Sequence, residues 1–107
     1  MNTFLIQATY SHSATLSLIK NPQDRAAAVR SMIEKAGGQL HGFWFALGEY
    51  DIVAVAQMPD AVSAAAFSMA IGGSGAMNTY KTTTLLTSEE AMQAMKHAAT
   101  IAYQPPK

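Results

Sequence analysis

The fold is decided by the stretch Phe43-Trp44-Phe45-Ala46-Leu47-Gly48-Glu49-Tyr50-Asp51-Ile52-Val53-Ala54-Val55. It consists of two runs of aromatic and β-branched residues, which favour strands, on either side of a short polar turn. The pattern predicts a β-hairpin at the centre of a sheet, with strands over roughly 39–47 and 51–58. Because hairpin turns often need a residue with positive φ, we expect Gly48 to adopt one.

The residues before the hairpin predict one strand and one long helix. Residues 3–10 alternate with a period of two, as expected of a strand with one face packed on helices. Ser11-His12-Ser13 is expected to cap a short helical turn. Asn21-Pro22-Gln23-Asp24 is typical of a helix start, with Asn21 as the cap and the proline at the first helical position. Gly37-Gly38 is expected to end this helix.

The residues after the hairpin predict a helix, a fourth strand and a C-terminal helix. Asp60 follows a proline and is expected to cap a helix that runs to about Ile71. The connection 72–75, rich in glycine, is expected to be flexible and to lead into a strand over about 76–86. Thr87 and Glu90 have the spacing of a capping box, which opens the last helix. The expected buried stripe of the middle helix is Val62, Ala65, Ala66, Met69 and Ala70.

The predicted order of elements is β-α-β-β-α-β with an extra C-terminal helix. This order indicates an α+β fold of the ferredoxin-like kind, in which an antiparallel sheet carries its helices on one face. We expect a single domain over 1–100 and a disordered tail over 101–107. The second face of the sheet is left bare, and we expect it to join copies of the chain in a homo-oligomer.

The composition excludes several classes of function. Seven basic and seven acidic residues give zero net charge, and no basic cluster is present for binding nucleic acid. The absence of cysteine excludes disulfides and thiol chemistry. Without a signal peptide or an apolar run of roughly 20 residues, we expect a soluble cytoplasmic protein with no membrane partner. The seven methionines are expected mainly to fill the core.

The chain resembles the GYD-domain family, which is named after a turn of the type Gly48-Glu49-Tyr50-Asp51. The helix start at 21–25, the glycine stop at 37–38, the run from 43 to 51 and the Pro-Asp pair at 59–60 carry the resemblance. It covers roughly residues 3–96. The resemblance implies a ferredoxin-like fold related to the dimeric α/β barrels, and it implies no particular activity.

Glu49 and Asp51 are the first candidates for chemistry. Residues two apart in an extended stretch point the same way, so these carboxylates can lie together and serve general acid–base catalysis. Turns also select acidic residues for structural reasons. We therefore favour the interpretation that Asp51 accepts hydrogen bonds from turn amides, that Glu49 is solvated and that Tyr50 packs at the sheet edge.

The histidines are the second candidates. His41 shares a strand face with Phe43 and Phe45 if that strand is regular, and His12 follows the first strand at a sheet end. A meeting of His12, His41 and a hairpin carboxylate would suit a metal ion. The sequence has no close metal-ligand spacing, and we expect neither a metal nor a cofactor. The loop 72–75 does not predict a phosphate site, because it follows a helix instead of leading into one.

Two function classes remain. In the favoured one, the protein is a non-catalytic homo-oligomeric module that binds a small apolar molecule or a partner on the bare sheet face. That face is expected to carry Leu5, Gln7, Thr9, His41, Phe43 and Phe45, with Trp44 in a subunit interface. In the alternative, it is a small cofactor-free isomerase or monooxygenase, with His12 or His41 as base and Tyr10 or Tyr50 orienting an apolar substrate. A closed pocket with a converging histidine and acid would favour the enzyme.

Overall fold

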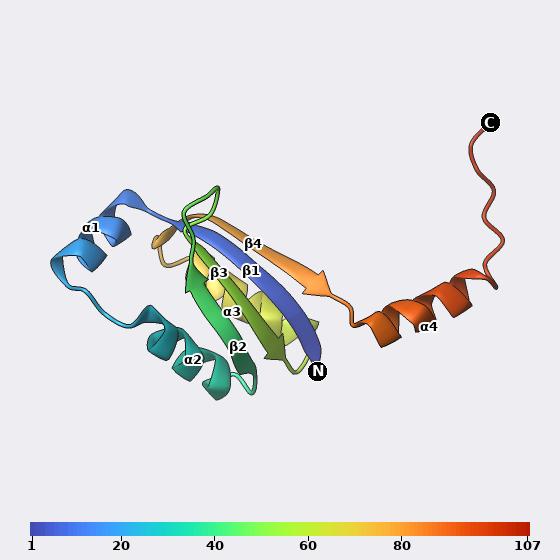
Figure 1. The fold of residues 1–107 in the computed structure, drawn as a ribbon, viewed down its shortest axis with the longest axis horizontal. Helices are drawn as coiled ribbons and strands as arrows, with labels where there is room; N and C mark the ends of the chain where they lie inside the picture. The colour runs from blue at the N-terminus through green and yellow to red at the C-terminus, as the bar shows by residue number, and fades with distance from the viewer.

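Four antiparallel strands form one sheet in the computed structural model, which describes residues 1–107 (Figure 1). The strands are β1 (Asn2–Tyr10), β2 (Gln39–Phe45), β3 (Ile52–Met58) and β4 (Met77–Leu85), in the order β2-β3-β1-β4. Each strand pairs antiparallel with its neighbours. The predicted ferredoxin-like α+β class is confirmed, since this order and these directions belong to the split βαβ arrangement.

Four helices accompany the sheet, namely α1 (His12–Lys20), α2 (Arg25–Lys35), α3 (Ala61–Gly72) and α4 (Ser88–Ala98). Ile33 of α2 and Ala64 of α3 share one buried cluster with the inner face of the sheet. These two helices therefore cover one face, as predicted. None of the helices combines the length and the apolar character that crossing a membrane requires.

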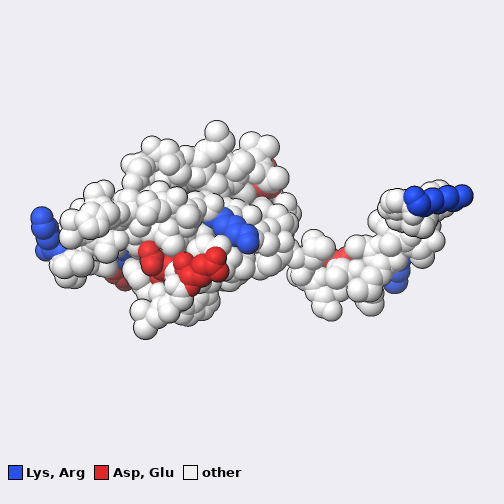
Figure 2. All heavy atoms as spheres, turned by 90° about the horizontal axis from the view of Figure 1, so that it is seen from above, with Lys and Arg blue, Asp and Glu red and all other residues white.

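The C-terminal helix α4 projects away from the body together with the residues that follow it (Figure 1). Figure 2 shows this arm joined to the body by a narrow neck, and most of the visible surface carries neither acidic nor basic side chains. Thr87 and Glu90 form the predicted capping box, so the helix has a well-defined start although none of its residues is buried.

The inner face of the sheet follows from strict alternation along β1 and β3. Phe4, Ile6 and Ala8 are buried and alternate with half-buried residues, and β3 repeats the pattern. Because side chains of a strand point to the two faces in turn, the predicted helix-facing side of the first strand is confirmed. Only ten of the 107 residues are buried, so the layer between sheet and helices is incompletely filled.

The predicted cap of α2 is wrong. Asp24 is the N-cap, and its Oδ1 accepts a hydrogen bond from the Ala27 N–H at 3.2 Å. The Asn21 N–H instead donates to the Ser17 carbonyl at 2.8 Å and ends α1. The proline after Asn21 therefore lies in the connection between two helices, where its fixed φ is also tolerated. The glycine stop agrees with the prediction, since Gly37 has a φ of +86° just after α2.

The predicted buried stripe of α3 is also wrong. Val62 and Met69 are 78% and 75% exposed, whereas Ala64 is buried and Phe67 is half-buried. Apolar residues surround this helix, so their spacing does not select the side that faces the sheet. The other expected members, Ala65, Ala66 and Ala70, are exposed as well.

Most methionines do not fill the core, contrary to the prediction. Met58 of β3 is the only buried one. Helical spacing marks an apolar helix face, but it does not say whether the same chain covers that face. The exposed methionines are Met1, Met32, Met69, Met92 and Met95, and the last two belong to α4.

Gly48 does not adopt the positive φ that the hairpin pattern predicted. The residues with positive φ are Gly37 and Gly75, at +86° and +79°. The connection between β2 and β3 is longer than a two-residue turn, and the Ala46 N–H closes it by donating to the Asp51 carbonyl at 2.8 Å. A longer connection spreads the reversal over several residues, so none needs the left-handed conformation.

A β-bulge in β2 decides which of its side chains face the helices. The pairing with β3 shifts between Leu40 and Gly42, so His41 is an additional residue in this strand. Phe43 and Phe45 lie opposite buried residues of β3 and face the helices. The prediction that His41, Phe43 and Phe45 share the bare face is therefore wrong, because it assumed a regular strand.

The bare face of the sheet is defined here by Leu5, Trp44, Val53 and Val55. Trp44 pairs with Val53 and is 56% exposed, and the other three side chains are half-buried. The Trp44 indole folds back over Gly42, where any Cβ would overlap the ring. The glycine in the bulge thus makes room for the only tryptophan of the chain.

Candidate functional site

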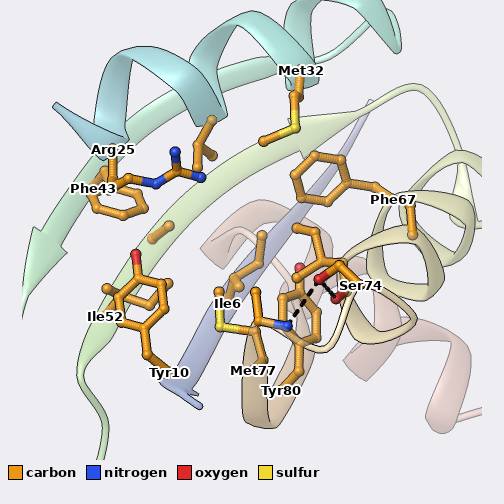
Figure 3. A pocket seen from close by; sticks show the side chains of 15 residues that line it. Ile6, Tyr10, Arg25, Met32, Phe43, Ile52, Phe67, Ser74, Met77 and Tyr80 are labelled. Atoms are coloured by element: carbon orange, nitrogen blue, oxygen red, sulfur yellow. Dashed lines mark hydrogen bonds between the residues drawn. The ribbon is translucent and has the colours of Figure 1, made fainter. Parts of the chain in front are cut away.

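A cavity of about 330 Å³ lies between the inner face of the sheet and the helices α2 and α3 (Figure 3). We call it the inner pocket. Thirteen of its fifteen lining residues are hydrophobic, and Arg25 and Ser74 are the exceptions. Its volume is at the lower end of the range of about 300–1,000 Å³ that is usual for small-molecule sites.

Side chains from the sheet and both helices shape the inner pocket. Met32 of α2 and Phe67 of α3 face one another across it (Figure 3). Ile6 and Ala54 belong to its floor on the two central strands. Because the Ala54 side chain is small, it leaves space beneath the helices that a larger core residue would fill.

Arg25 is the only charged residue that lines the inner pocket. It is the first residue of α2 and follows the N-cap Asp24 directly. Its Nη1 donates a hydrogen bond to Gln23 Oε1 at 2.9 Å, and it forms no salt bridge with a carboxylate. The charge of this guanidinium group is therefore available to an anion.

Tyr10 lies at the end of β1, and its hydroxyl points toward Arg25 (Figure 3). Burial raises the pKa of Tyr10 above its usual value, and the neighbouring guanidinium group offsets only part of this effect. The phenol therefore stays a neutral hydrogen-bond donor at neutral pH. Its ring stacks on Phe45 with centroids 6.2 Å apart, and Phe45 meets Phe43 edge-on at 5.8 Å.

The hydroxyl of Tyr80 is buried and has no hydrogen-bond partner. Burial raises the pKa of Tyr80, and the nearby Ser68 and Thr82 hydroxyls only moderate this effect. Ser68 and Thr82 bond to each other at 3.0 Å and leave Tyr80 unpaired. An unpaired buried hydroxyl costs free energy of folding, because it has lost its hydrogen bonds to water and gained none in the protein.

The loop after α3 closes one end of the inner pocket. The Ser74 hydroxyl donates to the Ile71 carbonyl at 2.6 Å and accepts from the Ala76 N–H at 3.2 Å (Figure 3). Gly75 between them has a φ of +79°, which glycine adopts without strain. The connection 72–75, which the sequence marked as flexible, thus contributes Ser74 to the lining, and Ala76 follows directly after it.

The structure separates the nine candidate site residues into three groups. Tyr10 and Phe43 line the inner pocket. Gln7 and Trp44 lie on the bare side of the sheet. The remaining candidates line no part of the pocket: His12, His41 and Glu49 are exposed, and Tyr50 and Asp51 are half-buried in the β2–β3 loop.

Asp51 supports the inner pocket from outside. Its Oδ2 accepts a hydrogen bond from the Tyr10 N–H at 2.9 Å, and its own N–H donates to the Ala8 carbonyl at 2.9 Å. The carboxylate of Asp51 thus accepts from an amide of β1 and not from a turn amide, which differs from the expected contact. No three histidine, aspartate or glutamate side chains gather closely enough to hold a metal ion.

The sequence interpretation missed Arg25, Phe67 and Tyr80 as pocket residues. Tyr80 lies opposite Ala8, so alternation along the sheet places it on the inner face. Phe67 is the one aromatic side chain in an alanine-rich helix. The Phe67 pattern was available in the sequence, whereas the pairing of Tyr80 with Ala8 comes from the structure. Arg25 carries no such signal, because its place depends on where α2 begins.

An antiparallel sheet of this order, covered on one face by two helices with a pocket between them, defines an α+β protein of ferredoxin-like architecture. The chain belongs to the GYD domain family, whose family model matches residues 4–95. The resemblance seen in the sequence is therefore confirmed. No curated protein and no solved structure matches the chain.

Proposed function

We propose that the protein is a homo-oligomeric module that binds a small apolar molecule in the inner pocket. The observation that carries this proposal is the almost wholly apolar lining of a cavity of about 330 Å³. Groups that line an unfilled apolar space lack packing partners on one side, and a ligand of matching shape supplies them. Hydrophobic walls with a few polar groups are the usual composition of small-molecule sites.

The lining supports binding more than catalysis. It contains no histidine, aspartate or glutamate, which are the commonest general acids and bases. The alternative of a cofactor-free isomerase or monooxygenase needs such a group beside the substrate. His12 and His41, which the sequence suggested as bases, are exposed and lie outside the lining.

The bare face supports the homo-oligomeric part of the proposal. Its apolar side chains lie on the side of the sheet that α2 and α3 leave uncovered. Met92 and Met95 add exposed apolar surface on α4. An isolated helix of 11 residues is marginal in water, so packing against a second copy of the chain would stabilise α4.

A neutral fluorescent probe, 1-naphthylamine, tests the binding proposal. We expect its emission to rise when it is mixed with the protein. Ala70 lines the inner pocket, and Ala70→Phe should weaken binding by about tenfold or more because the new ring occupies the cavity. Ala66→Phe is the matched control, since Ala66 is exposed on the same helix and does not line the cavity. Equal affinity in all three proteins would contradict the inner pocket as the site.

A further inference from the structure

We infer that the ligand of the inner pocket is a short apolar molecule with one carboxylate group, which Arg25 binds. This inference rests on the proposed function, because it specifies the chemical class of the molecule that occupies the same cavity. Four observations carry it: an unpaired cation, a neutral donor beside it, an apolar remainder and the size of the cavity.

The cation is the Arg25 guanidinium group, the only charge among fifteen lining residues. Its only side-chain hydrogen bond goes to the neutral amide of Gln23. The surrounding lining is apolar, and electrostatic attraction is stronger where the local dielectric constant is low. The planar guanidinium group also matches a carboxylate in a bidentate arrangement, which neutral ligand groups cannot reproduce.

The amides at the start of α2 are not the anion site. Asp24 caps this helix, and its own carboxylate accepts from the Ala27 N–H at 3.2 Å. The helix terminus is thus already paired with a negative group. The guanidinium side chain of Arg25 extends from the start of α2 beneath the helix, where it lines the cavity (Figure 3). The side chain, and not the helix terminus, is therefore the partner of a bound carboxylate.

Tyr10 supplies a second donor at the same end of the inner pocket. Its hydroxyl points toward Arg25 (Figure 3), and the phenol is neutral at neutral pH, since burial raises its pKa further above the ordinary value of 10.0. A neutral phenol donates its O–H to a carboxylate oxygen, so both groups can bind one anion. The Asp51 contact to the Tyr10 N–H and the stacking on Phe45 hold this donor in place.

The apolar part of the inner pocket determines the chemistry and the size of the ligand apart from its carboxylate. Between Met32 and Phe67 the lining offers no charged group, so this part accommodates hydrocarbon. A volume of about 330 Å³ holds a molecule of roughly ten non-hydrogen atoms, given about 30 Å³ for each water-sized group. Short aliphatic or aromatic monocarboxylic acids fit these limits.

Octanoate and 1-octanol test this inference, because they share a hydrocarbon chain and differ in charge. Isothermal titration calorimetry at neutral pH measures the affinity of each. We expect the parent protein to bind octanoate more tightly than 1-octanol, by at least about tenfold. The alcohol is the more hydrophobic of the two, so this order requires a specific partner for the carboxylate. Added salt should weaken the binding of octanoate and not that of 1-octanol.

Arg25→Met removes the charge and keeps a long apolar side chain. We expect it to lose the preference for octanoate and to leave the affinity for 1-octanol at or above that of the parent. Arg30→Met is the matched control, since Arg30 is exposed on the same helix and does not line the cavity. It should keep the preference of the parent. If Arg25→Met does not fold, the two ligands compared on the parent protein still decide the question.

The possible results separate this inference from the function on which it rests. Equal or tighter binding of 1-octanol by the parent would overturn the carboxylate inference and leave the apolar pocket proposal intact. A preference for octanoate that survives in Arg25→Met would overturn Arg25 as its partner. If neither molecule binds the parent and 1-naphthylamine also fails to bind, the proposed function and this inference are both wrong.

Discussion

Asp51 Oδ2 accepts a hydrogen bond from the Tyr10 N–H at 2.9 Å, and this contact ties the β2–β3 loop to the end of β1. The last residue of the Gly-Glu-Tyr-Asp turn therefore positions an aromatic residue that lines the inner pocket. The turn contributes to the site through this backbone contact. None of its own four residues lines the cavity.

Removing this contact should destabilise the protein. We expect Asp51→Ala to lower the free energy of unfolding by about 1–2 kcal/mol, because a hydrogen bond to a charged acceptor is lost at a partly solvated position. Asp51→Asn keeps an accepting oxygen and should recover part of the loss. Urea denaturation measures both variants, and Glu49→Ala should stay within about 0.5 kcal/mol of the parent. A similar loss in Glu49→Ala would show that Asp51 has no special role.

The start of α2 can be located by substitution. Asp24→Ala should destabilise the protein by about 0.5–2 kcal/mol, because the N-cap acceptor of Ala27 is removed. Asn21→Ala should change stability by less than about 0.5 kcal/mol, since only its backbone takes part in ending α1. Thermal unfolding distinguishes the two variants. The opposite order of melting temperatures would place the helix start at Asn21.

Two glycines should respond in opposite ways to a larger side chain. Gly48 has an ordinary φ and no atom within 4 Å of a built Cβ, so Gly48→Val should cost less than about 1 kcal/mol. A Cβ at Gly38 would overlap the Gln57 carbonyl and lie 2.7 Å from the Met58 sulfur. Gly38→Ala should therefore cost about 1–3 kcal/mol. Chemical denaturation of both variants tests this contrast, and a larger loss at Gly48 would contradict it.

The unpaired hydroxyl of Tyr80 should affect the free energy of unfolding and the dependence of that free energy on pH. Tyr80→Phe removes a buried donor without a partner and should stabilise the protein by about 1 kcal/mol. Tyr103→Phe, at an exposed position, is the control and should have no effect. A clear destabilisation by Tyr80→Phe would mean that the hydroxyl is paired in solution.

The pH dependence follows from the direction of the pKa shift. Burial raises the folded-state pKa of Tyr80 above 10.0, so the fold favours the neutral phenol. The raised pKa of Tyr80 makes a contribution to the free energy of unfolding that is complete below pH 10.0. This contribution is lost as the pH rises through the folded-state pKa. A near-ultraviolet titration should show a late phenolate component from Tyr10 and Tyr80, and this component should become smaller in Tyr80→Phe. An unchanged titration curve in that variant would contradict the assignment.

The proposed oligomer should be detectable by light scattering. We expect the parent to have at least twice the monomer mass of 11.4 kDa. Val55→Glu places a charge on the bare face and should shift the mass toward that of the monomer. Val62→Glu is the matched control, because Val62 is exposed on α3. A parent mass of 11.4 kDa at micromolar concentration would show that the bare face does not join subunits.

Local sequence signals predicted much of the fold. Caps at Ser11, Asp60 and Thr87 were recognised because a cap depends on residues within one helical turn. The inner face of β1 was recognised because alternation is a local pattern. The predicted buried side of α3 was wrong, because apolar residues lie all round this helix. Only the packed structure shows that the side with Ala64 is buried.

The candidate site was less predictable than the fold. One inserted residue at His41 shifts the rest of β2 by one position, and nothing local in the sequence marks this bulge. Phe43 was therefore placed on the wrong face. Arg25 was overlooked, because its position over the cavity depends on the cap at Asp24 and on the gap between α2 and α3.

The position of Trp44 has a practical consequence for spectroscopy. The chain has one tryptophan, and its indole lies on the bare face, over Gly42. Two of the four tyrosines, Tyr10 and Tyr80, line the cavity on the other side of the same sheet. Tryptophan emission therefore reports the environment of the bare face, while changes in tyrosine absorbance include the inner pocket. Subunit association and ligand binding can thus be followed as two separate optical signals in the unlabelled protein.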